Sequence, residues 1–286
     1  MRRTGKASLA ALAFWCFTGH FLFSQELVQA PRADGAQTPL RVYSPVGGGC
    51  APLALISPGA GGSEDGYSYL AKALRDDGWR AIVMGHRESG SAALRSDIHE
   101  AGGIKEGLRQ LVDDPKAYDA RLMDIEATLK WAGASCKAPF VALLGHSMGA
   151  RTVMVETGAK NKLGVKAGQD RFAAYVAMSP DGPDAMFPEH AWGGIQKPVL
   201  VLTGTRDKSM STGGYGSRTI PYEDMPAGCK WLGVIDGATH LNFAGIGMAG
   251  TTEKLTLLEV KTFLDGLRGG TCGVPVKAEG VSVKNK

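Results

Sequence analysis

Six short apolar runs, separated by segments of helical or loop character, constrain the fold of this chain more than any other feature. They are residues 51–57 (APLALIS), 80–85 (RAIVMG), 139–145 (PFVALLG), 172–179 (FAAYVAMS), 198–204 (PVLVLTG) and 230–236 (KWLGVID). Continuous apolar runs of this length are typical of strands buried on both faces of a parallel sheet. Helical patterns at 63–78, 119–133 and 251–267, the last expected to begin with a threonine cap, lie between or after them. The alternation predicts an α/β fold with a mostly parallel central sheet and helices on both faces.

The chain divides into four predicted segments. Residues 1–24 read as a signal peptide, 25–39 as a polar irregular linker, 40–272 as one α/β domain, and 273–286 as a flexible tail. The first segment has a basic start (MRRTGK) and then an apolar run that is short and interrupted for a spanning helix. We therefore expect an exported protein, periplasmic or secreted, that begins between residues 25 and 37 and has no stable membrane insertion. An uncleaved membrane anchor is the alternative.

The distribution of charge argues against a nucleic-acid partner. The net charge is +4, and Arg2, Arg3 and Lys6 contribute +3 of it within the leader, which leaves 4 − 3 = +1 for the rest of the chain. A nearly neutral body lacks the basic surface that binds phosphate backbones.

Cysteine spacing favours disulfides over a metal site. Beyond the leader the chain has four cysteines, Cys50, Cys136, Cys229 and Cys272. An even number in an exported chain indicates disulfides, and four cysteines allow three pairings. None of the C-x-x-C or H-x-x-H spacings typical of zinc ligands occurs among them, so a zinc site is not expected.

The stretch GHSMGA at 145–150 combines a serine with flanking glycines at the end of the run 139–145. G-x-S-x-G between a strand and a helix is the pattern of a nucleophilic serine on a strained turn, here Ser147. The base expected for this architecture is His240, which follows the run 230–236 and precedes the helix at 251–267. The expected oxyanion donors are the backbone N–H groups of Met148 and Ala60, the latter in the glycine-rich loop SPGAGGS.

These motifs resemble those of serine hydrolases with the α/β-hydrolase fold, across roughly residues 40–270. Within that fold the chain is similar to secreted relatives of dienelactone hydrolases and platelet-activating-factor acetylhydrolases, on the stretches LISPGAGG, LLGHSMGA, PVLVLTGTRDKS and IDGATHLNF. The resemblance implies a cofactor-independent serine esterase acting on small-molecule carboxylic esters. Ser147 replaces the cysteine nucleophile of true dienelactone hydrolases, so lactone chemistry is not implied. Pro58-Gly59 stands where many relatives have His-Gly.

The triad acid has two candidates, Asp181 and Asp207, because each follows a predicted strand and the fold accepts an acid after either. Asp207 is favoured because TGTRDKS resembles the acid loop of the family. The strand before Asp207 is also expected beside the one that leads to His240.

The resemblance leaves the acyl substrate open. A thioesterase or peptidase would use the same residues, and a binding protein that has lost turnover would keep the fold. Small or medium esters are favoured because neither of the loops 86–108 and 180–195 has the length or apolarity of a large lipase lid. Trp192 and His86 are candidate pocket residues.

The fold also predicts how the cysteines pair. Cys50 and Cys136 precede strands that are sheet neighbours in this fold, while Cys229 precedes the run 230–236 and Cys272 follows the final helix. We therefore expect the disulfides Cys50–Cys136 and Cys229–Cys272.

Overall fold

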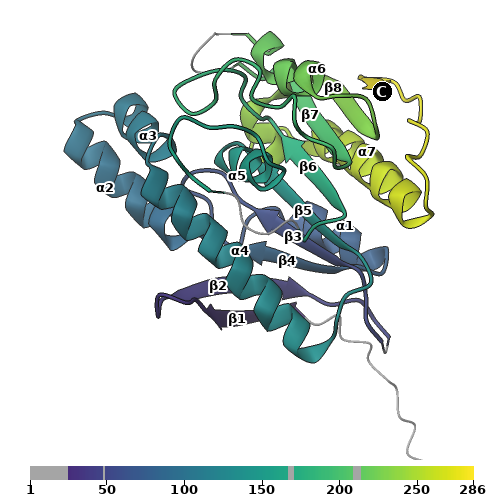
Figure 1. The fold of residues 1–286 in the computed structure, drawn as a ribbon, viewed down its shortest axis with the longest axis horizontal. Helices are drawn as coiled ribbons and strands as arrows, with labels where there is room; N and C mark the ends of the chain where they lie inside the picture. The colour runs from purple at the N-terminus through teal and green to yellow at the C-terminus, as the bar shows by residue number, and fades with distance from the viewer. Residues whose placement is uncertain (1–24, 48, 167–170, 209–213) are drawn as a thin grey trace, which may run out of the picture.

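The computed structural model describes residues 25–47, 49–166, 171–208 and 214–286, so the predicted signal peptide at 1–24 lies outside it. The described residues form one nine-stranded sheet in the order β1-β2-β4-β3-β5-β6-β7-β8-β9. In Figure 1 this order runs upward from β1 to β8. The six strands from β4 to β8 are parallel, and β1, β2 and β9 are antiparallel to their neighbours. The strand bounds are Gln25–Pro31 (β1), Gln37–Tyr43 (β2), Leu53–Ser57 (β3), Arg80–Met84 (β4), Val141–His146 (β5), Ala174–Met178 (β6), Val199–Arg206 (β7), Lys230–Thr239 (β8) and Val281–Asn285 (β9).

Helices cover both faces of the sheet. They are Ser68–Asp76 (α1), Ser91–Ala101 (α2), Ile104–Val112 (α3), Pro115–Ser135 (α4), Met148–Glu156 (α5), Ile220–Asp224 (α6) and Gly250–Arg268 (α7), with 3₁₀ turns at Arg87–Ser89 (η1), Gly216–Thr219 (η2) and His240–Ala244 (η3). The predicted threonine cap of α7 is wrong, because Ala249 occupies that position without a side-chain hydrogen bond. In the part of the chain that the structure describes, no helix is long and apolar enough to cross a membrane.

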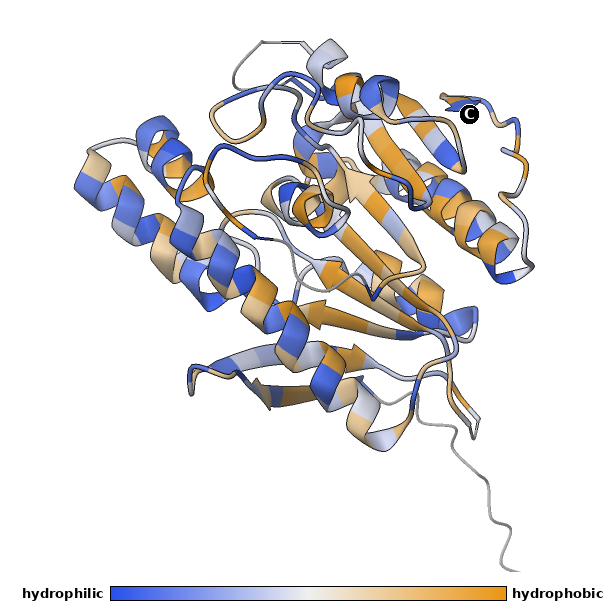
Figure 2. Ribbon diagram, in the orientation of Figure 1, coloured by the Kyte–Doolittle hydropathy of each residue, from blue (hydrophilic) through white to orange (hydrophobic). Residues whose placement is uncertain are grey.

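Two apolar layers, one on each face, explain why the central strands read as continuous apolar runs. On β3, Leu53 and Leu55 pack toward α4 and α5, whereas Ala54 and Ile56 pack toward α1 and α7. Successive side chains of a strand point to opposite faces, so a sheet covered on both sides needs apolar residues at every position. Figure 2 shows the result as strands that are mostly hydrophobic and helices that mix both characters. The predicted α/β architecture is confirmed.

Both ends of the described chain differ from the prediction. Residues 25–39 were expected to be an irregular linker, but they form β1, the turn after it and the first residues of β2. The hairpin of β1 and β2 joins the sheet because β2 pairs with β4. The expected flexible tail contains β9, which pairs with β8 from Trp231 to Ile235. Both β1 and β9 are edge strands with few buried residues, so they lack the apolar runs that mark the central strands.

The two predicted disulfides are present in the structure. Cys50 pairs with Cys136 and Cys229 with Cys272, with Cα atoms 5.6 Å and 5.1 Å apart. The first bridge joins the chain before β3 to the end of α4, and the second joins the start of β8 to the segment after α7. Each closes a long loop, which stabilises a fold by about 2–4 kcal/mol.

A buried carboxyl group on α7 gives the fold a testable pH dependence. Glu259 is fully buried, and neither of its carboxyl oxygens has a hydrogen-bond partner among the described residues. Burial raises its pKa from 4.5 to about 7. Because the folded-state pKa lies above the unfolded one, Glu259 destabilises the folded state least below pH 4.5, where it is protonated in both states, and this cost in free energy of unfolding grows until the pH passes 7.

We therefore expect Glu259→Leu to stabilise the protein more at pH 8 than at pH 5. The difference between the two gains should be about 2–3 kcal/mol in free energy of unfolding, because the pKa of Glu259 rises from 4.5 to about 7 on folding. Urea denaturation of both proteins at the two pH values measures it. Equal gains at pH 5 and pH 8 would contradict the assignment.

Candidate active site

The turn after β5 presents Ser147 at the carboxyl edge of the sheet. Ser147 has φ 55° and ψ −119°, a backbone conformation that residues other than glycine rarely adopt. Helix α5 begins at the next residue. Both glycines of the pattern are required by close packing. A Cβ on Gly145 would lie 2.3 Å from the Gly149 carbonyl oxygen, and a Cβ on Gly149 would lie 2.0 Å from that of Ser57. The strained turn is thus held between β3 and α5, with the serine hydroxyl at its apex.

His240 lies between Ser147 and Asp207. Its Nε2 is 2.9 Å from the Ser147 hydroxyl oxygen, and its Nδ1 is 3.0 Å from Asp207 Oδ1. The carboxylate can only accept, so Nδ1–H donates to it and Nε2 is free to accept the serine proton. The three residues follow β5, β7 and β8, whose carboxyl ends meet at one edge of the sheet. This arrangement can deprotonate the serine as it attacks a carbonyl carbon.

Asp207 is buried but kept ionised by its surroundings. Its Oδ2 accepts hydrogen bonds from Ser179 Oγ at 2.5 Å and Thr203 Oγ1 at 2.9 Å, and Arg218 Nε lies 2.8 Å from its Oδ1. Burial by itself would raise the pKa of Asp207. The hydrogen bond from His240 and the charge of Arg218 outweigh burial and hold that pKa below its usual value.

Asp181, the other candidate acid, has different partners. Its Oδ2 is 3.0 Å from Arg151 Nη2 and its Oδ1 is 3.1 Å from Arg218 Nη1. Burial would raise its pKa, but these two guanidinium groups lower it. The structure therefore brings Asp207, and not Asp181, against the His240 imidazole. Neither arginine was expected from the sequence, because a single arginine outside any motif carries no signal of its own.

The two backbone N–H groups expected as oxyanion donors, those of Met148 and Ala60, both belong to segments next to Ser147. The Met148 N–H is the first of α5 and has no carbonyl within the helix to bind. The Ala60 N–H has no hydrogen-bond partner among the described residues. Its loop lies directly against the serine, since a Cβ on Gly59 would be 3.2 Å from Ser147 Cβ.

His146 connects this loop to the histidine loop. Its Nε2 is 3.0 Å from the His240 carbonyl oxygen, which can only accept, so Nδ1 must accept the Tyr67 hydroxyl proton at 2.8 Å. The Tyr67 oxygen in turn accepts the Gly59 N–H at 3.1 Å. Burial lowers the pKa of His146 well below 6.5, so the ring stays neutral. Both ring nitrogens are thus engaged by Tyr67 and the His240 backbone rather than by the Ser147 hydroxyl.

A cavity of about 430 Å³ opens over Ser147 and His240. Its apolar walls come from α3 and α5, through Leu108, Val112 and Met148, and the segment after β6 adds charged residues. The segments 86–108 and 180–195, predicted from the sequence to be loops, both contribute to the lining, although much of the first is helical and forms α2 and the start of α3.

Trp192 and His86 do not line this cavity, which corrects the prediction for both. Trp192 is fully buried in the core against Phe187. His86 is buried beneath the loop after β3, with Ser57 Oγ at 2.9 Å and Asp124 Oδ2 at 2.8 Å. The sequence predicted that His86 lies near the carboxyl ends of the strands, because it follows a predicted strand. Only the tertiary structure shows that its side chain points into the interior.

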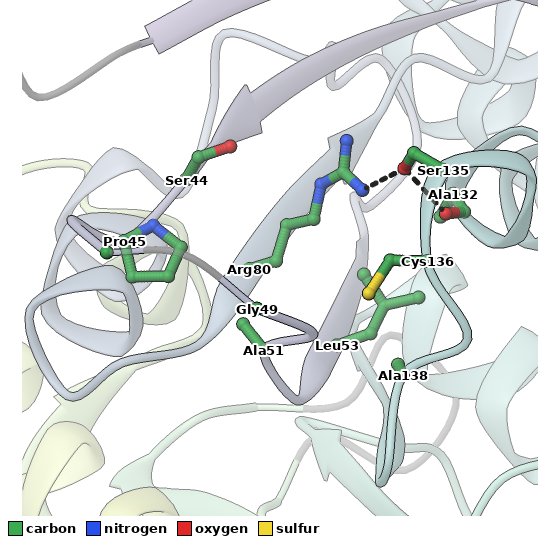
Figure 3. A pocket seen from close by; sticks show the side chains of 11 residues that line it. Ser44, Pro45, Gly49, Ala51, Leu53, Arg80, Ala132, Ser135, Cys136 and Ala138 are labelled. Carbon is green, nitrogen blue, oxygen red and sulfur yellow. Dashed lines mark hydrogen bonds between the residues drawn. The ribbon is translucent and has the colours of Figure 1, made fainter.

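A second cavity, of about 420 Å³, lies at the opposite edge of the sheet (Figure 3). It is lined by Arg80 at the start of β4, Leu53 at the start of β3, and Ser135 and Cys136 at the end of α4. Arg80 Nη1 donates to Ser135 Oγ at 3.1 Å. None of the residues of the serine–histidine–aspartate arrangement reaches this edge. Among the described residues, no group of three or more His, Cys, Asp or Glu side chains could hold a metal ion.

Comparison with solved structures defines the fold. One match is Est1E from Butyrivibrio proteoclasticus, with 16% sequence identity, a TM-score of 0.59, and coverage of 86% of this chain and all of that one. Thermogutta terrifontis esterase 2, phosphorylated by paraoxon, matches at 16% identity and a TM-score of 0.57 over 85% of this chain and 94% of its own. A putative dienelactone hydrolase from Klebsiella pneumoniae matches at 17% identity and a TM-score of 0.57 over 82% and 97%.

The chain therefore has the α/β-hydrolase fold, and the solved structures that share it include esterases. No family model matches the sequence, and no curated protein matches it.

Proposed function

We propose that this protein is a serine hydrolase that cleaves carboxylic esters of small or medium size through an acyl-enzyme. The observation that carries the proposal is the hydrogen-bonded series Ser147–His240–Asp207, with links of 2.9 Å and 3.0 Å, at the floor of a cavity of about 430 Å³. A volume of this order suits a small-molecule substrate. The esterases among the solved structures of the same fold support the same class of reaction.

The chemistry is two successive acyl transfers. The Ser147 oxygen bonds to the ester carbonyl carbon while His240 Nε2 takes the hydroxyl proton, and Asp207 stabilises the imidazolium. The carbonyl oxygen becomes an oxyanion facing the N–H groups of Met148 and Ala60. The bond to the alcohol oxygen then breaks, and the proton on His240 passes to that oxygen. Water, deprotonated by His240, attacks the acyl carbon, and the acid leaves as the proton returns to Ser147.

Hydrolysis of nitrophenyl esters of graded acyl length tests this proposal on the purified protein. We expect turnover that is highest for short and medium chains and stoichiometric labelling of one site by a fluorophosphonate. The absence of both turnover and labelling would contradict the proposal that this protein is a serine hydrolase. Turnover of thioesters or peptides in preference to every ester would move the protein to another hydrolase class.

The two disulfides also support the proposal that the protein is exported. The pairing of β1 supports a cleavage site at the early end of the expected range, because Gln25–Pro31 pairs with β2 and Arg32 donates to Asp124 in the core at 3.3 Å. Cleavage beyond Gln25 would remove part of this paired strand. We therefore expect a mature chain that begins at or just before Gln25. Intact-mass analysis of protein from the native host checks this, and a retained Met1 would contradict it.

A further inference from the structure

A buried arginine lies directly behind the loop that carries Ala60. Arg121 on α4 is fully buried, and its guanidinium makes four hydrogen bonds, all to neutral acceptors. Nη1 donates to the Pro58 carbonyl at 2.7 Å and to Ser57 Oγ at 3.2 Å. Nη2 donates to the Gly59 carbonyl at 3.4 Å, and Nε donates to Ser89 Oγ at 2.8 Å. This guanidinium therefore binds backbone carbonyls and hydroxyl groups of the loop region and does not pair with a carboxylate in the described part of the chain.

Ser57, His86 and Asp124 form the same series of hydrogen bonds as the candidate triad, but they cannot act on a substrate. All three are buried, and the Ser57 oxygen, which accepts from Arg121, donates its proton to His86 Nε2. His86 Nδ1–H donates to Asp124, which also binds Arg32. Burial lowers the pKa of His86 to about 4, so its ring is neutral at pH 7. This series fixes the Ser57 hydroxyl in the orientation that receives the Arg121 N–H.

The contacts to the two carbonyls determine where the opposite N–H groups point. In a trans peptide the N–H lies opposite the C=O of the same unit, and the described chain has no cis peptides. The Pro58 carbonyl faces Arg121, so the Gly59 N–H faces away, and it donates to Tyr67. The Gly59 carbonyl accepts from Arg121 at 3.4 Å and from the Gly62 N–H at 3.1 Å, so the Ala60 N–H of the same peptide faces away from both and has no partner among the described residues. The loop itself packs against Ser147, because a Cβ on Gly59 would lie 3.2 Å from Ser147 Cβ.

Arg121 also brings charge. Burial lowers its pKa to about 10, which leaves the guanidinium protonated at neutral pH. Among the described residues it forms no ion pair, so its charge is not cancelled by a direct carboxylate contact. A cation one peptide unit behind an oxyanion, in a site of low dielectric, stabilises that oxyanion.

We propose that Arg121 is a positioning residue for acyl transfer, which holds the Pro58 and Gly59 carbonyls so that the Ala60 N–H faces the oxyanion and adds a buried positive charge behind it. This inference rests on the proposed function. Arg121 should stabilise the charged transition state and should not change the affinity for the uncharged ester.

The test compares Arg121→Met and Arg121→Lys with wild type, each normalised to the number of sites that a fluorophosphonate labels. We expect kcat/KM of a nitrophenyl ester to fall by about 10²-fold in Arg121→Met, the size of losing one oxyanion donor, and by about tenfold in Arg121→Lys. The Ser147 oxygen adds to the carbonyl carbon of a trifluoromethyl ketone, and the carbonyl oxygen becomes an oxyanion. Affinity for this inhibitor should therefore fall by a factor similar to that for kcat/KM. Affinity for the matching methyl ketone, which stays a neutral ketone, should not change.

The matched control is Thr128→Val, a second buried polar side chain on α4, which donates only to the Asp124 carbonyl at 2.7 Å. It should lower stability without lowering kcat/KM per labelled site. Should Arg121→Met not fold, Arg121→Lys and its two ketone affinities decide the question alone. Full kcat/KM per labelled site in Arg121→Lys, or equal losses for both ketones, would overturn the proposal. Wild type that neither turns over esters nor labels would instead count against the proposed function.

Discussion

Replacing Ser147 with alanine is expected to lower kcat for ester hydrolysis by about 10⁶-fold, the scale seen when a triad serine is removed. The reason is that no other hydroxyl occupies the point 2.9 Å from His240 Nε2 in the described structure. The proposed oxyanion donors and the cavity remain, so a small residual acceleration should persist. Alanine tolerates φ 55° about as well as serine, and the fold should be retained.

Steady-state kinetics and fluorophosphonate labelling measure this effect. Ser135→Ala is the matched control, because Ser135 is an exposed serine at the opposite edge of the sheet, bonded to Arg80. It should keep full turnover and labelling. Labelling that persists in Ser147→Ala and is lost in another serine variant would place the nucleophile elsewhere.

Asp207→Asn is expected to cut kcat by about 10⁴-fold while the protein stays folded. An amide can donate to His240 Nδ1 and so favours the tautomer whose Nε2 carries the proton, which cannot accept the serine proton. The variant also removes the negative charge that stabilises the imidazolium. Asp207 is fully buried and its pKa is lowered, so the wild-type carboxylate supplies that charge across the neutral range.

Asp181→Asn is the comparison that decides between the two candidate acids. Its carboxylate binds Arg151 and Arg218 rather than the imidazole, so we expect a loss on the order of tenfold, far below that of Asp207→Asn. Circular dichroism and thermal unfolding of both variants separate folding from catalysis. Near-native turnover in Asp207→Asn together with loss in Asp181→Asn would move the acid to Asp181.

The central sheet and the serine turn could be predicted because their physical requirements are local. A strand buried on both faces needs a continuous apolar run, and every such run in the sequence became a strand of the parallel sheet. The serine turn is recognised from its own residues, because glycine at 145 avoids the Gly149 carbonyl four residues on; glycine at 149 meets a tertiary requirement, the close approach of the Ser57 carbonyl of β3. The position of His240 followed from chain order, since the segment after the last parallel strand lies at the same sheet edge as Ser147.

The edge strands could not be predicted in this way. β1 and β9 are largely exposed, so hydrogen bonding to a neighbouring strand rather than side-chain burial determines them. Most residues of β1 pair with residues of β2 that are 12 or more positions away, and β9 pairs with β8 across more than 40 positions. The sequence of one segment does not indicate such a pairing.

The sequence by itself determined the fold class, the disulfide pairing and the candidates Ser147 and His240. The tertiary structure alone decided which aspartate contacts the imidazole, and that His86 and Trp192 point into the interior. It also revealed Arg121 and Arg218, whose side chains reach carbonyls and carboxylates from distant segments. The physical reason is that continuous apolar runs and the G-x-S-x-G pattern are properties of consecutive residues, whereas the partners of a buried charge are determined only when separate elements pack together.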